Sequence, residues 1–113
     1  MRAMQIRLTK AWRELDAENV RALPGQLGVF ELANKAGEVV FIGMAGGREL
    51  FGLRSALERV LAARPAGAAR FRFEVNMQYQ TRYRELLMAH VADHGRLPAA
   101  NNPDETRSLG RIG

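Results

Sequence analysis

Residues 27–43 read LGVFELANKAGEVVFIG, and this stretch decides the fold. Two apolar runs, residues 27–33 and 38–43, flank a four-residue turn from Asn34 to Gly37. Asparagine and glycine at the ends of this turn tolerate the positive φ that a tight turn demands, and the second run is β-branched or aromatic through its centre. The stretch therefore predicts a β-hairpin whose second strand is buried on both faces and central in its sheet.

Downstream of the hairpin, the hydrophobic period switches twice. Beyond a glycine-rich loop, apolar residues at helical spacing predict a helix from Leu53 to Leu61, and Pro65 and Gly67 end the pattern. Strict alternation over residues 70–77 predicts a strand with phenylalanines on one face and mostly charged residues on the other. Helical spacing then returns over residues 79–94.

Upstream, the pattern is weaker. Residues 4–8 alternate and predict a possible extra strand, and Asp16 is placed to cap a short helix over residues 17–22. The fold class is therefore α/β (α+β), a small three-stranded sheet flanked by helices with a possible fourth, N-terminal strand. We expect an N-terminal extension over residues 1–22, one domain over residues 23–102 and a loose C-terminal tail over residues 103–113.

Composition limits the class of protein. A chain of 113 residues suits one domain. The absence of cysteine excludes disulfides, thiol catalysis and cysteine-ligated metal sites. No apolar stretch approaches the roughly 20 residues of a membrane span, and the first ten residues do not resemble a signal peptide, so we expect a cytoplasmic protein with no membrane partner.

The charge is strongly basic. The formal net charge is +5, the pI is near 10.7, and all basic residues except Lys10 and Lys35 are arginine. Arginine suits phosphate because its planar fork donates hydrogen bonds in pairs. DNA or another nucleic acid is a plausible partner, although an arginine-rich composition can equally reflect genomic base content.

Two triplets in the hairpin carry a family resemblance. Gly28-Val29-Phe30 and Phe41-Ile42-Gly43 are followed by an arginine in the next helix, Arg54, a glutamate in the last, Glu85, and then Asn101-Asn102. In this order the chain resembles the GIY-YIG nuclease superfamily over residues 23–102. The resemblance implies cleavage of a DNA phosphodiester with one divalent metal ion.

The resemblance assigns a role to each matching residue. Glu85 would hold Mg²⁺ or Mn²⁺, and Arg54 would steady the phosphate. Each also has a purely structural alternative, an ion pair of Glu85 with Arg82 or of Arg54 with Glu58.

Three positions depart from the family. Phe30 and Phe41 stand where the family has tyrosine, and Met44 stands where many members have lysine or histidine. A phenyl ring can neither orient a water nor relay a proton. The catalytic site therefore reads as degraded.

Other residues are candidates for chemistry. Tyr79 or Tyr83 could serve as a substitute base, although packing explains both, and His90 and His94 have a spacing that can bind zinc but lack the accompanying glutamate. The residues expected to bind nucleic acid come from the glycine-rich loop and the arginines: Gly46, Gly47, Arg48, Arg54, Arg70 and Arg72.

Three functions remain open. The leading hypothesis is a GIY-YIG-like domain that has lost catalysis and binds nucleic acid. The alternatives are an active metal-dependent DNA endonuclease that uses Glu85 and Arg54, and a protein-interaction module on the same scaffold.

Overall fold

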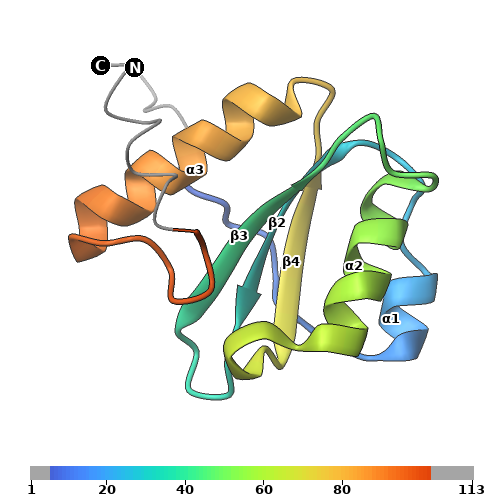
Figure 1. Ribbon diagram of the computed structural model, residues 1–113, viewed down its shortest axis with the longest axis horizontal. Coiled ribbons are helices and arrows are strands. Elements are labelled where there is room, and N and C mark those ends of the chain that lie inside the picture. The colour runs from blue at the N-terminus through green and yellow to red at the C-terminus, as the bar shows by residue number, and fades with distance from the viewer. Residues whose placement is uncertain (1–5, 103–113) are drawn as a thin grey trace.

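The sheet has four antiparallel strands in the order β1-β4-β2-β3 in the computed structural model, which describes residues 6–102. The strands are β1 (Arg13–Glu14), β2 (Gly28–Ala33), β3 (Val39–Ala45) and β4 (Arg70–Val75). The helices are α1 (Ala17–Arg21), α2 (Gly52–Ala63), the short 3-10 helix η1 (Pro65–Gly67) and α3 (Tyr79–His94). Figure 1 shows α1 and α2 on one side of the sheet and α3 on the other. The predicted α+β class is confirmed.

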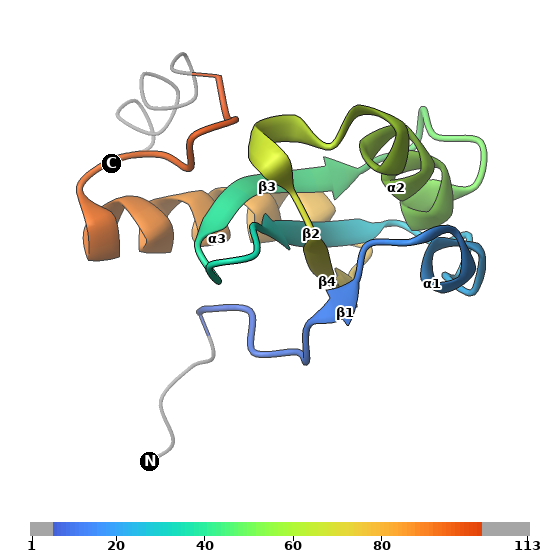
Figure 2. The same cartoon turned by 90° about the horizontal axis from the view of Figure 1, so that it is seen from below.

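The hairpin forms as predicted, but its second strand is not central. Gly37 has φ +90°, and the Asn34 side chain accepts a hydrogen bond of 3.0 Å from the backbone N–H of Glu38. Strand β3 lies at the edge of the sheet, whereas β2, buried at every position, lies between β3 and β4 (Figure 2). The prediction was wrong because β4 pairs with the first strand of the hairpin, a choice that local pattern does not reveal.

The outer edge of β3 is covered by the end of the described chain. The backbone N–H of Ala100 donates to the carbonyl of Val40 at 2.9 Å. The buried side chain of Asn101 donates to the carbonyl of Ile42 and accepts from its N–H, both at 2.9 Å. One amide thus replaces a neighbouring strand and satisfies both backbone groups of a buried residue.

The fourth strand comes from an unexpected segment. Residues 13–14, rather than residues 4–8, pair with β4. Residues 4 and 5 lie outside the described residues, and residues 6–8 form no strand; instead Leu8 is buried against α3. That packing holds the segment under the helix and away from the edge of the sheet. The predicted tail, residues 103–113, also lies outside the described part of the chain.

Two apolar cores fill the two faces of the sheet. Between the sheet and the α1 and α2 helices lie Leu15, Val20, Leu23, Phe30, Leu32, Leu53, Leu57 and Phe71. Between the sheet and α3 lie Leu8, Val29, Ile42, Leu86 and Leu87. The alternating side chains of β2 therefore serve both cores. Within residues 6–102, no helix is long and apolar enough to cross a membrane.

Charged side chains also lie on the α3 face of the sheet. Glu31, which is only 6% exposed, pairs with Arg72 at 2.7 Å, and the Arg72 guanidinium lies 4.2 Å from the centre of the Trp12 ring. Burial raises the pKa of Glu31, although Arg72 opposes the shift. Buried Arg82 pairs with Glu74 at 3.0 Å. Burial would raise the pKa of Glu74, but hydrogen bonds from Arg82 and Asn76 lower it overall.

Replacing the amide of Asn101 should destabilise the edge of the sheet. Asn101→Ala removes both hydrogen bonds to Ile42 and leaves the buried N–H and carbonyl of Ile42 without those partners. We therefore expect a loss of about 1–3 kcal/mol in the free energy of unfolding. Urea denaturation measures the loss. Gln80→Ala, at an exposed position on α3, is the control, and an equal effect of the two variants would contradict the role given to Asn101.

The buried carboxylate of Glu31 and the half-buried carboxylate of Glu74 should shift acid stability in opposite directions. Glu74, whose pKa is lowered by folding, stabilises the protein above its ordinary pKa, and this contribution is lost as the pH falls. Glu31, whose pKa is raised by folding, favours the folded state more as the pH falls. Thermal melts between about pH 7 and about pH 3 should therefore show a shallower loss of stability in Glu74→Gln and a steeper loss in Glu31→Gln than in wild type. Shifts of the same sign in both variants would refute this account.

Candidate functional site

Phe30 and Phe41, the two phenylalanines of the hairpin triplets, pack together on the α2 face of the sheet. Their ring centroids lie 5.9 Å apart, and the ring planes are tilted by 40°. Gly43 makes room for them, because a Cβ at that position would lie 2.4 Å from the ring of Phe30 and 2.7 Å from that of Phe41. The final glycine of the second triplet is thus required by aromatic packing rather than by a turn.

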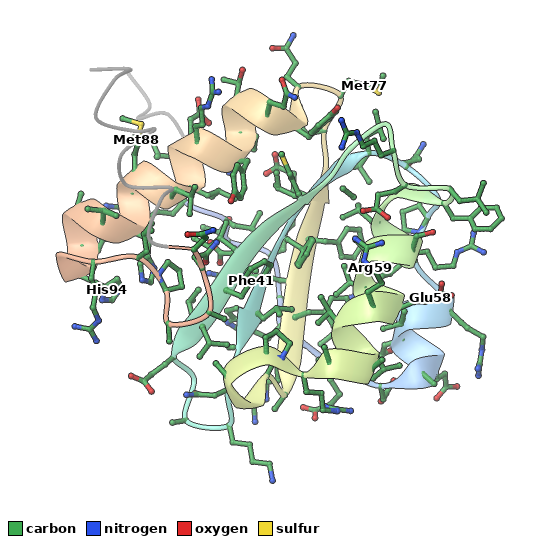
Figure 3. The ribbon with its side chains drawn as sticks, in the orientation of Figure 1. Phe41, Glu58, Arg59, Met77, Met88 and His94 are labelled. Atoms are coloured by element: carbon green, nitrogen blue, oxygen red, sulfur yellow. The ribbon has the colours of Figure 1, made fainter. Side chains whose placement is uncertain are left out.

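The rings line a surface hollow of about 380 Å³ between the hairpin, α2 and the start of η1. Tyr83 of α3 contributes a third ring to its wall, so the hollow also draws on the helix from the other face of the sheet. Figure 3 shows Phe41 and Arg59 on the two sides of this region, while Glu58 of the same helix points away. Its lining residues are Phe30, Phe41, Gly43, Met44, Ala56, Arg59, Val60, Ala63, Pro65 and Tyr83. Below, we refer to it as the aromatic hollow.

Arg59 joins the aromatic hollow to the loop after β3. Its guanidinium donates two hydrogen bonds of 2.5 Å to the Glu49 carboxylate, one to each oxygen. These hydrogen bonds raise the pKa of Arg59 and lower that of Glu49. The bidentate contact orients the planar group at the rim, and the Arg59 side chain remains 65% exposed.

Arg54 does not line the aromatic hollow. Its Nε donates to the carbonyl of Leu23 at 3.3 Å, and its guanidinium lies 5.2 Å from the centre of the Phe51 ring. Neither the expected phosphate role nor the alternative ion pair with Glu58 describes these contacts. Arg54 ties α2 to the segment that follows α1.

Glu85 also lies apart from the two phenylalanines. It accepts a hydrogen bond of 3.2 Å from Arg82, which is the i, i+3 contact considered as its structural alternative. Arg82 is buried and also binds Glu74 and the carbonyl of Ile6, so the group belongs to the α3 face of the sheet. The structure therefore does not bring Glu85 and the phenylalanines into one site.

The one carboxylate of the magnesium or manganese site that the resemblance implies, Glu85, is paired with Arg82. Among residues 6–102, no three histidine, aspartate or glutamate side chains are grouped so that they could hold a metal ion. The rings of His90 and His94 are neighbours, with centroids 4.3 Å apart and planes tilted by 34°, and burial together with the charge of His94 lowers the pKa of His90. A pair without a third ligand of this kind gives no closed zinc site.

The expected nucleic-acid-binding arginines divide into two groups. Arg70 pairs with Glu14 at 3.2 Å on the surface, and the largely buried Arg72 pairs with Glu31 at 2.7 Å, so both guanidinium groups already contact a carboxylate. Arg48 is exposed and makes no ion pair or hydrogen bond with the described residues. Arg48 is thus the candidate best placed to meet a phosphate.

The glycine-rich loop before Arg48 is held by α3. The Gly47 N–H donates to the Tyr79 hydroxyl at 3.3 Å, and a Cβ on Gly46 would lie 2.9 Å from the Tyr79 ring. A Cβ on Gly47 would meet nothing within 4 Å, so this residue faces open space. Tyr79 therefore contacts the loop and does not line the aromatic hollow.

Sequence reasoning did not place Arg59 or Tyr83 in one site with the two phenylalanines. Arg59 was not among the predicted site residues, although Ala56, Arg59 and Ala63 recur at helical spacing on one stripe. Tyr83 was assigned to packing against apolar neighbours. The stripe is visible in the sequence, but the sequence does not show which strand the stripe packs against.

Comparison with known proteins identifies a family but no activity. A search of curated proteins and a search of solved structures each returned no significant match. A family model matches residues 6–93, which is well over half of the chain. The chain therefore belongs to the family described as Domain of unknown function (DUF7508).

Proposed function

We propose that the chain is a GIY-YIG-like domain that binds nucleic acid without cleaving it. The observation that carries the proposal is the aromatic hollow, in which Phe30 and Phe41 occupy the tyrosine positions of the family beside a loop that carries the exposed Arg48. The half-buried ring of Phe41, which can stack on a base, and a neighbouring cation that can meet phosphate are the usual elements of such binding, while Phe30, only 3% exposed, packs against the Phe41 ring.

Loss of cleavage follows from the chemistry of the site. Phenylalanine cannot act as a general acid or base, and the loss of one such group typically lowers a rate by about 10²- to 10⁴-fold. Arg54 is bound to Leu23, and Glu85 is bound to Arg82. Neither side chain lines the aromatic hollow, so the expected phosphate ligand and the expected metal ligand both lie away from Tyr83, whose hydroxyl is the one hydroxyl among the lining residues.

Binding is supported by charge. The whole sequence carries a formal net charge of +5, which favours association with polyanions. Arg48 extends from a loop whose Gly47 leaves open space for close approach of a phosphate. In the cytoplasmic setting that the sequence predicts, nucleic acid would be an available partner.

A second candidate, a protein-interaction module, is favoured by exposed apolar side chains. Leu50 is 84% exposed and Met77 is 76% exposed, at the loop before α2 and just before α3. Large exposed apolar side chains are common singly, so they support this function less strongly than an aromatic hollow beside a cation supports nucleic-acid binding.

Removing the charge of Arg48 should weaken nucleic-acid binding. We expect Arg48→Ala to bind a fluorescent oligonucleotide less tightly than wild type and to reduce the slope of log affinity against log salt by about one. Fluorescence anisotropy over a series of salt concentrations measures both quantities.

Lys35→Ala is the matched control. It removes the same unit charge from the exposed turn at the other end of the hairpin and should leave binding nearly unchanged. Absence of salt-dependent binding by the wild-type protein would refute the proposed function and favour the protein-interaction candidate. Nicking of a supercoiled plasmid with added manganese, lost in Glu85→Ala, would instead restore the nuclease alternative.

A further inference from the structure

We infer that the aromatic hollow accepts a single unstacked base, so that the domain prefers single-stranded nucleic acid to a duplex. This inference rests on the proposed function and gives it a substrate class. It is argued from the shape of the hollow, its ring surfaces, and the charge beside it.

The hollow is large enough for a base and has the right surface. Its volume of about 380 Å³ lies within the range of small-ligand sites, roughly 300–1,000 Å³. Most of its lining is apolar: the ring of Phe41 is half-buried, and the tilted ring of Phe30 and Val60 of α2 are buried beside it. Such a surface favours the flat, apolar face of a base.

A base paired within a duplex cannot offer that face. Its faces are covered by neighbouring bases, and only its edges are exposed in the grooves. A surface of rings can therefore contact a base only after the base has left the stack, which costs least in a single strand. A duplex would reach the protein through its phosphates alone.

Arg59 and Tyr83 add planar polar groups to the same hollow. Because the Nη1 and Nη2 atoms of Arg59 both donate to Glu49, the guanidinium plane is fixed at the rim, where it can stack on a base. Among the lining residues, Arg59 and Tyr83 are the ones with polar side chains. So few polar groups give little means of reading base edges, and we infer weak dependence on base identity.

The loop after β3 provides the complementary charge. Met44 lines the hollow, Glu49 binds Arg59 at its rim, and Arg48 lies between them in sequence. The loop thus leaves the hollow and returns to it, which keeps Arg48 close to the rim. A phosphate next to the bound base would meet Arg48, and this charge complementarity favours nucleic acid over an uncharged occupant.

Blocking the hollow tests the inference. Ala63 is an exposed lining residue on α2, and Ala63→Trp should fill the hollow and weaken binding of a labelled oligo-dT of about 12 nucleotides by about tenfold. Ala62→Trp places the same ring on the neighbouring exposed position, outside the lining, and should bind like wild type. Anisotropy with the single strand and with a duplex of equal length should show tighter wild-type binding of the single strand.

A second pair of variants covers the case in which Ala63→Trp does not fold, as judged by circular dichroism. Tyr83→Ala should weaken single-strand binding and Tyr83→Phe should retain most of it, because the ring and not the hydroxyl contacts the base.

The outcomes separate the inference from the proposed function. The inference is overturned if duplex and single strand bind with equal affinity, or if folded Ala63→Trp and Tyr83→Ala both bind like wild type. If Arg48→Ala still weakens binding in either case, the proposed function stands. Failure of wild type to bind either oligonucleotide would overturn both.

Discussion

Strand β2 is buried at all six of its positions, and the rest of the structure follows from covering it. A strand buried in this way needs a partner on each edge and a helix on each face. Strands β3 and β4 cover the edges, and α2 and α3 cover the faces. Because Glu31 is one of the six residues, burial also demands a cation, which Arg72 supplies while stacked on Trp12. The segment before β1 is thereby bound to the sheet.

The alternation of side chains along β2 also separates the aromatic hollow from the charged side chains on the α3 face. Phe30 faces α2 and forms part of the aromatic hollow, while Glu31, the next residue, faces α3 and belongs to the charged group. Glu85 lies on α3 with that charged group, bound to Arg82. Glu85 does not line the aromatic hollow, although Tyr83 of the same helix does. The charges on the α3 face are paired with one another within the fold, and the proposed binding surface lies on the α2 face.

Sequence reasoning recovered the elements whose pattern is local. The helix over residues 79–94 and the cap at Asp16 agree with the structure, and the alternation in β4 places Phe71 and Phe73 on the α2 face. It failed where a partner lies far along the chain. The position of β3 at the edge depends on β4 and on Asn101, and the burial of Arg82 depends on Glu74 and on the segment at Ile6. A charged residue with such partners looks from its sequence like a surface residue.

The sequence by itself determined the order of the elements, the side chains on each face of a strand or helix, and the absence of hydroxyls at positions 30 and 41. These properties depend on residue identity and on periods of two or 3.6 residues, which operate within one element. Only the tertiary structure decided that Arg59 and Tyr83 join Phe30 and Phe41, that Arg70 and Arg72 pair with carboxylates, and that Arg48 stays exposed. Those outcomes depend on which elements pack together, because the carboxylates that pair with Arg59, Arg70 and Arg72 come from other segments of the chain.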